Sequence, residues 1–209
     1  MNTKTFAQTL PVMDWYDKEA MTRYLQAVIE DRRSYAKRLE PIIDDTFKKA
    51  YAEYAQGNYY TCISIIENFF DTYKIYQIHA YMCTYLFEFK GLAQCKTNQL
   101  SSGICNLRQA MDLGSPTAKE ELNKYFWEYL NDAYQCYNSN NYSSCLQNIQ
   151  IALSTGLQNS EIYVLAGDTY RDAHNYSEAK RYYKTARKLG DSFYSARIKK
   201  MKELRKSLK

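Results

Sequence analysis

Apolar side chains recur every three or four residues along most of the chain, which is the spacing of one face of an α-helix. Such a stripe runs from Asp17 to Glu40 and predicts one long helix, which we expect Pro41 to end. The same spacing over 192–208 predicts a terminal helix. The first stripe contains Met21, Leu25, Val28, Tyr35 and Leu39, and the second contains Tyr194, Ile198, Met201, Leu204 and Leu208.

Few residues interrupt this helical pattern. The 209 residues include seven Gly and three Pro, well below the ordinary usage of these two residues. No Val- or Thr-rich run alternates as a β-strand does, and an aromatic content of 15% argues against disorder. We therefore expect an all-α fold, either as one domain or as a short array of small units.

A short motif recurs between the helical stretches. It reads Gly57-Asn58-Tyr59, Asn140-Asn141-Tyr142 and His174-Asn175-Tyr176, and a weaker copy begins at Leu100. In the same phase after each copy come Cys62 and Phe69, Gly103 and Ala110, Cys145 and Ala152, and Ala179 and Ala186. The starting residues 59, 100, 142 and 176 are separated by 41, 42 and 34 positions. The two longer intervals predict helices extended by about two turns.

The clearest copy spans residues 160–191. Its first half carries Tyr163, Ala166, Gly167 and Tyr170, and its second half carries Ala179, Tyr183 and Ala186. This order resembles the tetratricopeptide repeat (TPR), a pair of antiparallel helices. Three positions depart from the family pattern: Ala166 stands where Leu is usual, His174 where the turn Gly is usual, and Asp191 where Pro is usual.

The resemblance extends over residues 43–191, as four divergent units at about 43–76, 84–116, 126–159 and 160–191. It implies a right-handed superhelical solenoid of helix pairs, between an N-terminal helix at 17–42 and a basic capping helix at 192–209. Small residues such as Gly91, Gly103 and Gly167 would let paired helices approach closely. Larger residues such as Tyr183 would fill the space between units.

Six cysteines are present, and their spacing contains no C-x-x-C pair of the kind that holds zinc. Cys62 and Cys145 fall where the repeat requires a small apolar residue, so we interpret them as core residues. Disulfides in an oxidising compartment are the alternative.

The sequence contains no recognisable catalytic or cofactor motif. His79 and His174 are its two histidines, and neither is spaced to pair with a cysteine or carboxylate in a known kind of site. Nucleotide-binding, zinc-protease and hydrolase motifs are missing as well. We therefore predict a protein that is not an enzyme and needs no cofactor or metal.

In TPR proteins the first helix of each unit lines a concave groove that binds an extended peptide or a helix. The resemblance places in this groove Tyr51, Tyr54, Tyr85, Glu88, Trp127, Leu130, Tyr134, Tyr137, Asp168 and Arg171. Tyr and Trp favour binding surfaces, although packing inside the array is the alternative role for them. The positions that hold a partner's carboxylate in one TPR subtype are here Phe47, Tyr51, Leu92, Trp127 and Asn131. Only Asn131 suits that chemistry, so we expect no carboxylate clamp.

Charge divides unevenly along the chain. Residues 180–209 carry a net charge of +10, and the remainder carries −5. The predicted basic face of the terminal helix consists of Arg197, Lys199, Lys200, Lys202, Arg205 and Lys206. It is either a solvated cap or an electrostatic binder of nucleic acid or anionic membrane.

No apolar run is long enough to cross a membrane. The best candidate is 75–87, an uncharged stretch that also contains Gln77 and His79, and it predicts a buried helix. Within the N-terminal extension, residues 1–16, Phe6-Ala7-Gln8 resembles the end of a trimmed bacterial signal peptide. The core cysteines favour a cytoplasmic location, whereas that remnant favours a bacterial envelope. We expect a non-catalytic scaffold or adaptor for a protein or peptide partner, with self-association through the N-terminal helix as a further possibility.

Overall fold

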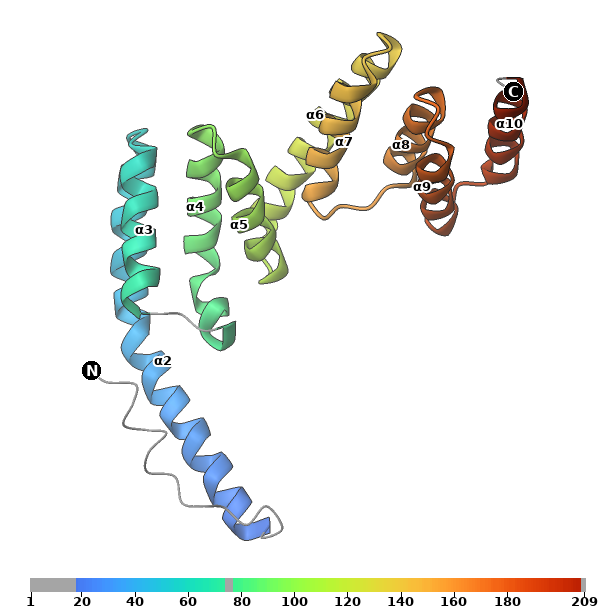
Figure 1. The fold of residues 1–209 in the computed structure, drawn as a ribbon. Helices are drawn as coiled ribbons and strands as arrows, with labels where there is room; N and C mark the ends of the chain where they lie inside the picture. The colour runs from blue at the N-terminus through green and yellow to red at the C-terminus, as the bar shows by residue number, and fades with distance from the viewer. Residues whose placement is uncertain (1–17, 74–76, 208–209) are drawn as a thin grey trace. The chain divides into compact units, whose positions relative to one another are not determined.

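The computed structural model describes residues 18–73 and 77–207, and within them it contains nine α-helices, one 3-10 helix and no strand (Figure 1). The elements are α2 (Lys18–Ala55), α3 (Tyr59–Tyr73), η1 (Gln77–Cys83), α4 (Thr84–Lys96), α5 (Leu100–Asp112), α6 (Pro116–Asn138), α7 (Tyr142–Ser154), α8 (Ser160–Asp172), α9 (Tyr176–Lys188) and α10 (Tyr194–Ser207). The all-α prediction is confirmed. The extension at 1–16, with its signal-like remnant, lies outside the described residues.

The chain divides into two compact units, residues 1–48 and 49–209. Helix α2 contributes to both, because it continues through Pro41 as far as Ala55. The predicted helix end at Pro41, and with it the boundary at residue 42, is therefore wrong. Proline costs about 3 kcal/mol inside a helix, but it stands here within a 38-residue helix, and one unfavourable residue does not end it. Thr46 donates a hydrogen bond to the Ile42 carbonyl 2.8 Å away, in the first turn after the proline.

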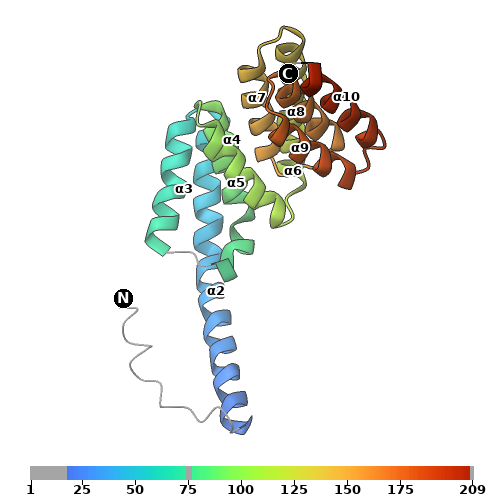
Figure 2. The same cartoon turned by 45° about the vertical axis from the view of Figure 1, so that its right-hand side comes forward.

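In the second unit, neighbouring helices pack in pairs. Helices α4 and α5, α6 and α7, and α8 and α9 form the closest pairs, and α10 packs on α9 (Figures 1 and 2). Each pair is joined by a short turn, which makes its two helices antiparallel. The extension predicted for one long interval is found in α6, which has 23 residues where α4, α5, α7, α8 and α9 have 13. In the other long interval the prediction of a longer α-helix is wrong, because residues 77–83 form η1.

The same turn joins the two helices of each of these pairs and also joins α2 to α3. Its first residue has a positive φ in all four copies: 80° at Gly57, 61° at Asn98, 56° at Asn140 and 61° at His174. Asn and His tolerate this left-handed conformation better than most side chains. The following residue donates its N–H to the carbonyl five positions earlier, over 2.8–2.9 Å in each copy. Asn141 and Asn175 then cap the next helix through their side chains. His174 therefore takes the conformation usual for the turn glycine.

Glycine permits a close contact between the backbones of α4 and α5. A Cβ atom added to Gly91 would lie 2.9 Å from the carbonyl oxygen of Gly103, and a Cβ on Gly103 would lie 2.9 Å from that of Gly91. In the α8–α9 pair, a Cβ on Gly167 would lie 2.5 Å from the Tyr183 ring. The fully buried Tyr183 thus packs inside its own pair. Tyr183 also forms a cluster with Met201 of α10, so it packs both within its pair and against the next element.

The cysteines agree with the expected core positions. Cys62, Cys83 and Cys145 are buried, Cys95 and Cys136 are half-buried, and Cys105 is exposed. All six are free thiols. Burial raises the pKa of Cys62 to about 11 and that of Cys83 to about 12.

We expect Gly91→Ala or Gly103→Ala to lower the free energy of unfolding by about 1–3 kcal/mol, because the added methyl group would push two backbones apart. Urea unfolding followed by circular dichroism measures this change. Ser102→Ala, at an exposed position of α5, is the control and should leave the midpoint unchanged. Equal midpoints for all three variants would show that α4 and α5 do not approach as closely as described.

We also expect a maleimide reagent near neutral pH to label Cys105 first in the folded protein. Cys62 and Cys83 should react only after denaturation, because burial excludes the reagent and their raised pKa values keep them as thiols. Peptide mapping by mass spectrometry gives the order of labelling. Early modification of Cys62 would contradict its placement in the core.

Candidate functional site

The first helices of the pairs present side chains at matching positions. Tyr85 of α4, Trp127 of α6 and Glu161 of α8 each stand thirteen residues before the positive-φ residue of their turn. Seven residues further along, about two turns, each helix presents a second side chain on the same side. Leu92, Tyr134 and Asp168 occupy this second position, and Tyr51 occupies it at the end of α2. We call these seven residues the first-helix stripe.

Three of the four aromatic members of the stripe are exposed to solvent. Tyr51 is 51% exposed, Tyr85 63% and Trp127 48%. Glu161 is also exposed, whereas Leu92, Tyr134 and Asp168 are half-buried. Of the aromatic residues expected in the groove, Tyr51, Tyr85 and Trp127 are thus exposed. Large exposed apolar side chains at repeated positions are characteristic of interaction surfaces.

Two stripe side chains, Tyr51 and Tyr134, contact the next first helix along the array. Tyr51 and Tyr54 pack edge-on against Phe89 of α4, with ring centroids 5.4 and 5.2 Å away. Tyr134 of α6 donates a hydrogen bond to Glu161 of α8 over 2.9 Å. Part of the tyrosine set thus packs between helices, as the alternative reading of the sequence expected, and another part faces solvent.

Three predicted groove residues are buried instead: Glu88 is 4% exposed, Leu130 2% and Arg171 5%. The wrong placement of these three residues has one geometric cause. Each follows a stripe residue by three positions, and three residues turn a helix side chain by about 60° away from the starting direction. Tyr54 and Tyr137 hold the same offset and are half-buried.

The buried Glu88 has a structural partner. It accepts a hydrogen bond from the Ser115 hydroxyl over 2.5 Å, and the Ser115 oxygen accepts one from the Ala118 N–H over 3.0 Å. Ser115 is the N-cap of α6. Glu88 therefore orients a helix cap and does not face the groove.

Arg171 is the centre of a charged network on α8. Its guanidinium contacts Asp168 at 2.5 Å and holds both oxygens of Asp172 at 2.7 and 2.8 Å. Tyr137 of α6 donates to Asp172 over 2.6 Å, and Tyr183 of α9 donates to Asp168 over 2.7 Å. The network thus joins three helices through fixed polar contacts.

Arg197 extends this network to α10. Its Nη1 lies 3.2 Å from Asp168, and its Nε lies 3.4 Å from Asp191. Its side chain is 26% exposed. The prediction of Arg197 on the basic solvent face is wrong, because two carboxylates hold it against the array.

The network shifts the pKa values of its members. Burial raises the pKa of the Tyr137 and Tyr183 hydroxyls, and the carboxylates of Asp172 and Asp168 raise them further. Burial alone would raise the pKa of Asp172, but hydrogen bonds from Arg171 and Tyr137 bring it below its ordinary value. Burial opposes the charge of Arg171, yet the hydrogen bond to Asp172 and the charge of Asp168 keep its pKa above the ordinary value. Arg171 and Asp172 are therefore both charged at neutral pH.

A hollow of about 370 Å³ opens beside this network. Its lining consists of Tyr137, Asp168, Arg171, Phe193, Ala196, Arg197 and Lys200. The structure therefore brings Tyr137, Asp168 and Arg171 together around this hollow, although Arg171 is buried and does not face a groove as predicted. Sequence analysis missed Asp172, Phe193 and Tyr183 as parts of this site. The adjacency of Asp172 to Arg171 was the available signal, whereas nothing in the pattern marked Phe193, which is 65% exposed.

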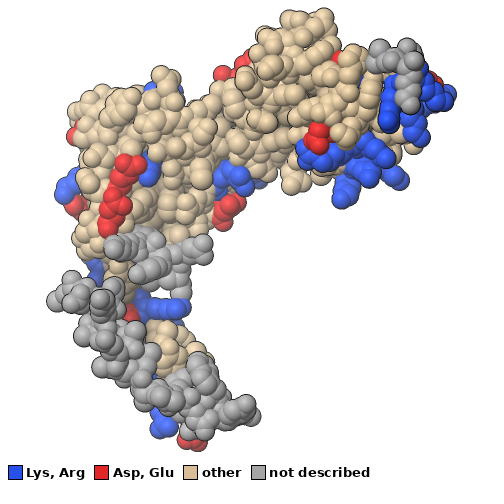
Figure 3. Space-filling view, in the orientation of Figure 1, with Lys and Arg blue, Asp and Glu red and all other residues tan. Residues whose placement is uncertain are grey.

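Basic side chains gather over α9 and α10 (Figure 3). The exposed members on α10 are Lys199, Lys200, Lys202, Arg205 and Lys206. In the N-terminal unit, Leu25 and Ile29 of α2 are about half exposed, at 50% and 48%. Self-association through this helix remains a prediction.

In the part of the chain that the structure describes, no group of three or more His, Cys, Asp or Glu side chains is placed to hold a metal ion. No described helix combines the length and apolar character that crossing a membrane requires. The Nδ1 atom of His174 lies 3.3 Å from the Tyr176 hydroxyl, at the turn before α9.

The chain matches no protein-family model and no curated protein sequence. The arrangement of its own side chains is therefore the basis for the functional argument.

We expect Asp172→Asn to destabilise the protein by about 1–3 kcal/mol at neutral pH, because it leaves Arg171 less well compensated. The lowered pKa of Asp172 means that its contribution is present above the ordinary value near 4 and is lost as pH falls through the folded value. The difference from wild type should therefore shrink toward strong acid. Urea unfolding over a pH series measures it, with the exposed Glu128→Gln as control. A difference that does not change with pH would contradict the ion pair.

Proposed function

We propose that the second unit is a TPR-like right-handed solenoid and acts as a non-catalytic scaffold or adaptor. Four identical turns, antiparallel pairs and glycine-mediated helix contacts support the architecture. A segment of a partner protein would bind along the first-helix stripe. The observation that carries this proposal is the exposure of Tyr85 and Trp127 at the same position of α4 and α6, together with the exposed Tyr51 at the second stripe position in α2.

Aromatic side chains of this kind provide a large contact area at small entropic cost, and they are common at binding hot spots. The acidic end of the stripe is different, because Asp168 is compensated by Arg171 and Arg197. Apolar contact rather than net charge would therefore supply most of the affinity. A partner segment would place apolar side chains against Tyr85 and Trp127, and its binding should depend weakly on salt.

The second candidate function is electrostatic binding of nucleic acid or anionic membrane by the terminal helix. It is favoured by the exposed basic side chains of α10 and by the net charge of +10 over residues 180–209. Binding to phosphate is strongly weakened by salt because it releases counterions. Salt dependence thus separates the two candidates.

Replacing Tyr85 and Trp127 together by Ala should weaken partner binding by at least about tenfold. The test is affinity capture from cells of the source organism at low and high salt, followed by calorimetric titration with the purified partner. Tyr60→Ala is a matched control, because Tyr60 is 69% exposed but lies on α3, outside the stripe. Circular dichroism should show that all variants remain folded.

A different result would favour the terminal helix as the functional surface. If capture yields nucleic acid or lipid that high salt removes and Lys199→Glu abolishes, the terminal helix is the functional surface. Binding unaffected by the Tyr85 and Trp127 substitutions would then assign the stripe aromatics to packing alone.

A further inference from the structure

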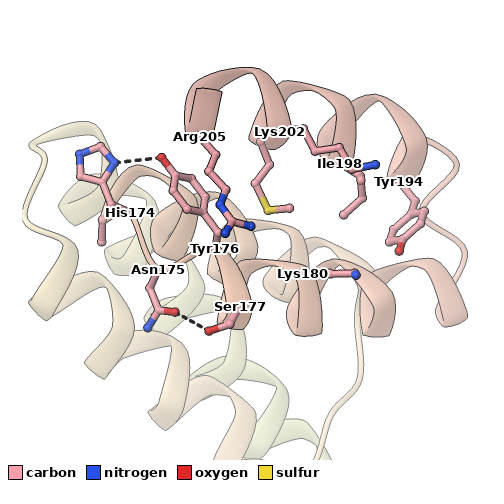
Figure 4. Close-up of a pocket in the computed structure, with 11 residues that line it drawn as sticks. His174, Asn175, Tyr176, Ser177, Lys180, Tyr194, Ile198, Lys202 and Arg205 are labelled. Carbon is pink, nitrogen blue, oxygen red and sulfur yellow. Dashed lines mark hydrogen bonds between the residues drawn. The ribbon is translucent and has the colours of Figure 1, made fainter. Parts of the chain in front are cut away.

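A second recess, of about 810 Å³, lies between α9 and α10 (Figure 4). It shares no residue with the first-helix stripe or with the hollow beside Arg171. Its wall at the start of α9 includes His174, Tyr176 and Ser177, and α10 supplies the opposite wall. The recess is therefore a separate feature of the terminal part of the array.

Three cations surround this recess: Lys180 comes from α9, and Lys202 and Arg205 come from α10 (Figure 4). All three are exposed, and none has an ion-pair partner among residues 18–73 and 77–207. No carboxylate lines the recess. The nearby Glu178 is held by Arg181 over 2.5 Å. The recess thus has a positive rim without a counter-charge of its own.

Its floor is apolar. Met201 is 6% exposed and packs with Ala179 and Tyr183 in one cluster, and Tyr194 and Ile198 lie against that cluster. The polar groups on the wall are partly satisfied by one another. Ser177 donates to Asn175 over 3.0 Å, and His174 lies 3.3 Å from the Tyr176 hydroxyl. An apolar floor below a basic rim distinguishes this recess from a uniformly basic patch.

We propose that this recess is a second binding site, for an acidic segment of a partner protein that inserts an apolar side chain. The apolar side chain would rest on Ile198 and Met201. Asp or Glu residues on either side of it would reach Lys180, Lys202 and Arg205. Opposite charge on the two surfaces favours this orientation and speeds association.

The combination of features favours a peptide over a nucleic acid or a membrane surface. A phosphate backbone requires cations along its path but gains nothing from an apolar floor of buried Met201 and half-buried Ile198. A bilayer surface is broad, whereas the cations here border a recess between two helices. An acidic peptide with one apolar anchor uses both the rim and the floor.

The first experiment is selection of a displayed random-peptide library on the full chain. Enriched peptides should carry Asp or Glu on both sides of an apolar residue. One such peptide, labelled with fluorescein, would then be titrated in an anisotropy assay. We expect Lys180→Glu together with Arg205→Glu to weaken its binding by about tenfold or more, because attraction becomes repulsion. Ile198→Ser should weaken it through loss of the floor.

Matched controls separate the recess from general charge. Lys184→Glu and Lys199→Glu make the same change at exposed positions of the same two helices, outside the lining. They should change the affinity much less than the rim substitutions do. Circular dichroism and thermal unfolding would check that every variant is folded. The Tyr85 and Trp127 double alanine variant should bind the acidic peptide like wild type, so failure of the stripe proposal is distinguishable from failure of this one.

Several outcomes would overturn the proposal. These are a selection without enrichment of acidic peptides, equal weakening by the control and rim substitutions, and unchanged affinity in Ile198→Ser. Stronger competition by duplex DNA or by phosphatidylserine vesicles than by unlabelled peptide would assign the basic rim to phosphate binding instead.

Discussion

The close approach of two antiparallel helices in each pair is the constraint on which the second unit depends. A single helix pair cannot bury its apolar side chains alone, so the pairs must stack. At Gly91 and Gly103 the approach leaves no space for even one methyl group, and at Gly167 the space is filled by Tyr183. The shared turn with its positive-φ residue sets the antiparallel direction. Together they fix which side of each first helix remains accessible.

The direction in which each side chain leaves its helix then decides its role on the first helices. Tyr85 and Trp127 face solvent, whereas Glu88 and Leu130, three residues later, are buried. On α8 the same rotation turns Arg171 inward, where it neutralises Asp168 and Asp172. Arg197 of α10 completes this compensation. The stripe is therefore aromatic and exposed at α4 and α6, and polar and internally paired at α8.

The sequence predicted the local features and missed those set by contacts between helices. Asn140-Asn141 and His174-Asn175 marked turns correctly, because Asn and His tolerate the required backbone conformation. Pro41 misled, since a helix boundary depends on the whole run of residues and not on one breaker. Glu88 and Arg197 were misplaced because their partners are set by helix packing. Glu88 lies three residues after Tyr85 and so turns toward the capping Ser115, whereas two aspartates hold Arg197 inward.

The inward position of Arg197 also bears on how the two proposed surfaces divide the charge of the terminal helix. Arg197 of α10 compensates the charge of Asp168. It therefore stabilises α8 and the stripe. Lys202 and Arg205 face the recess over α9, and neither has an ion-pair partner among the described residues. Because of the helix periodicity, Lys202 and Arg205 leave α10 in a different direction from Arg197. Charge changes at the rim of the recess therefore need not disturb the Asp168 network. One short helix can thus stabilise the end of the array on one side and present an acidic-peptide site on the other.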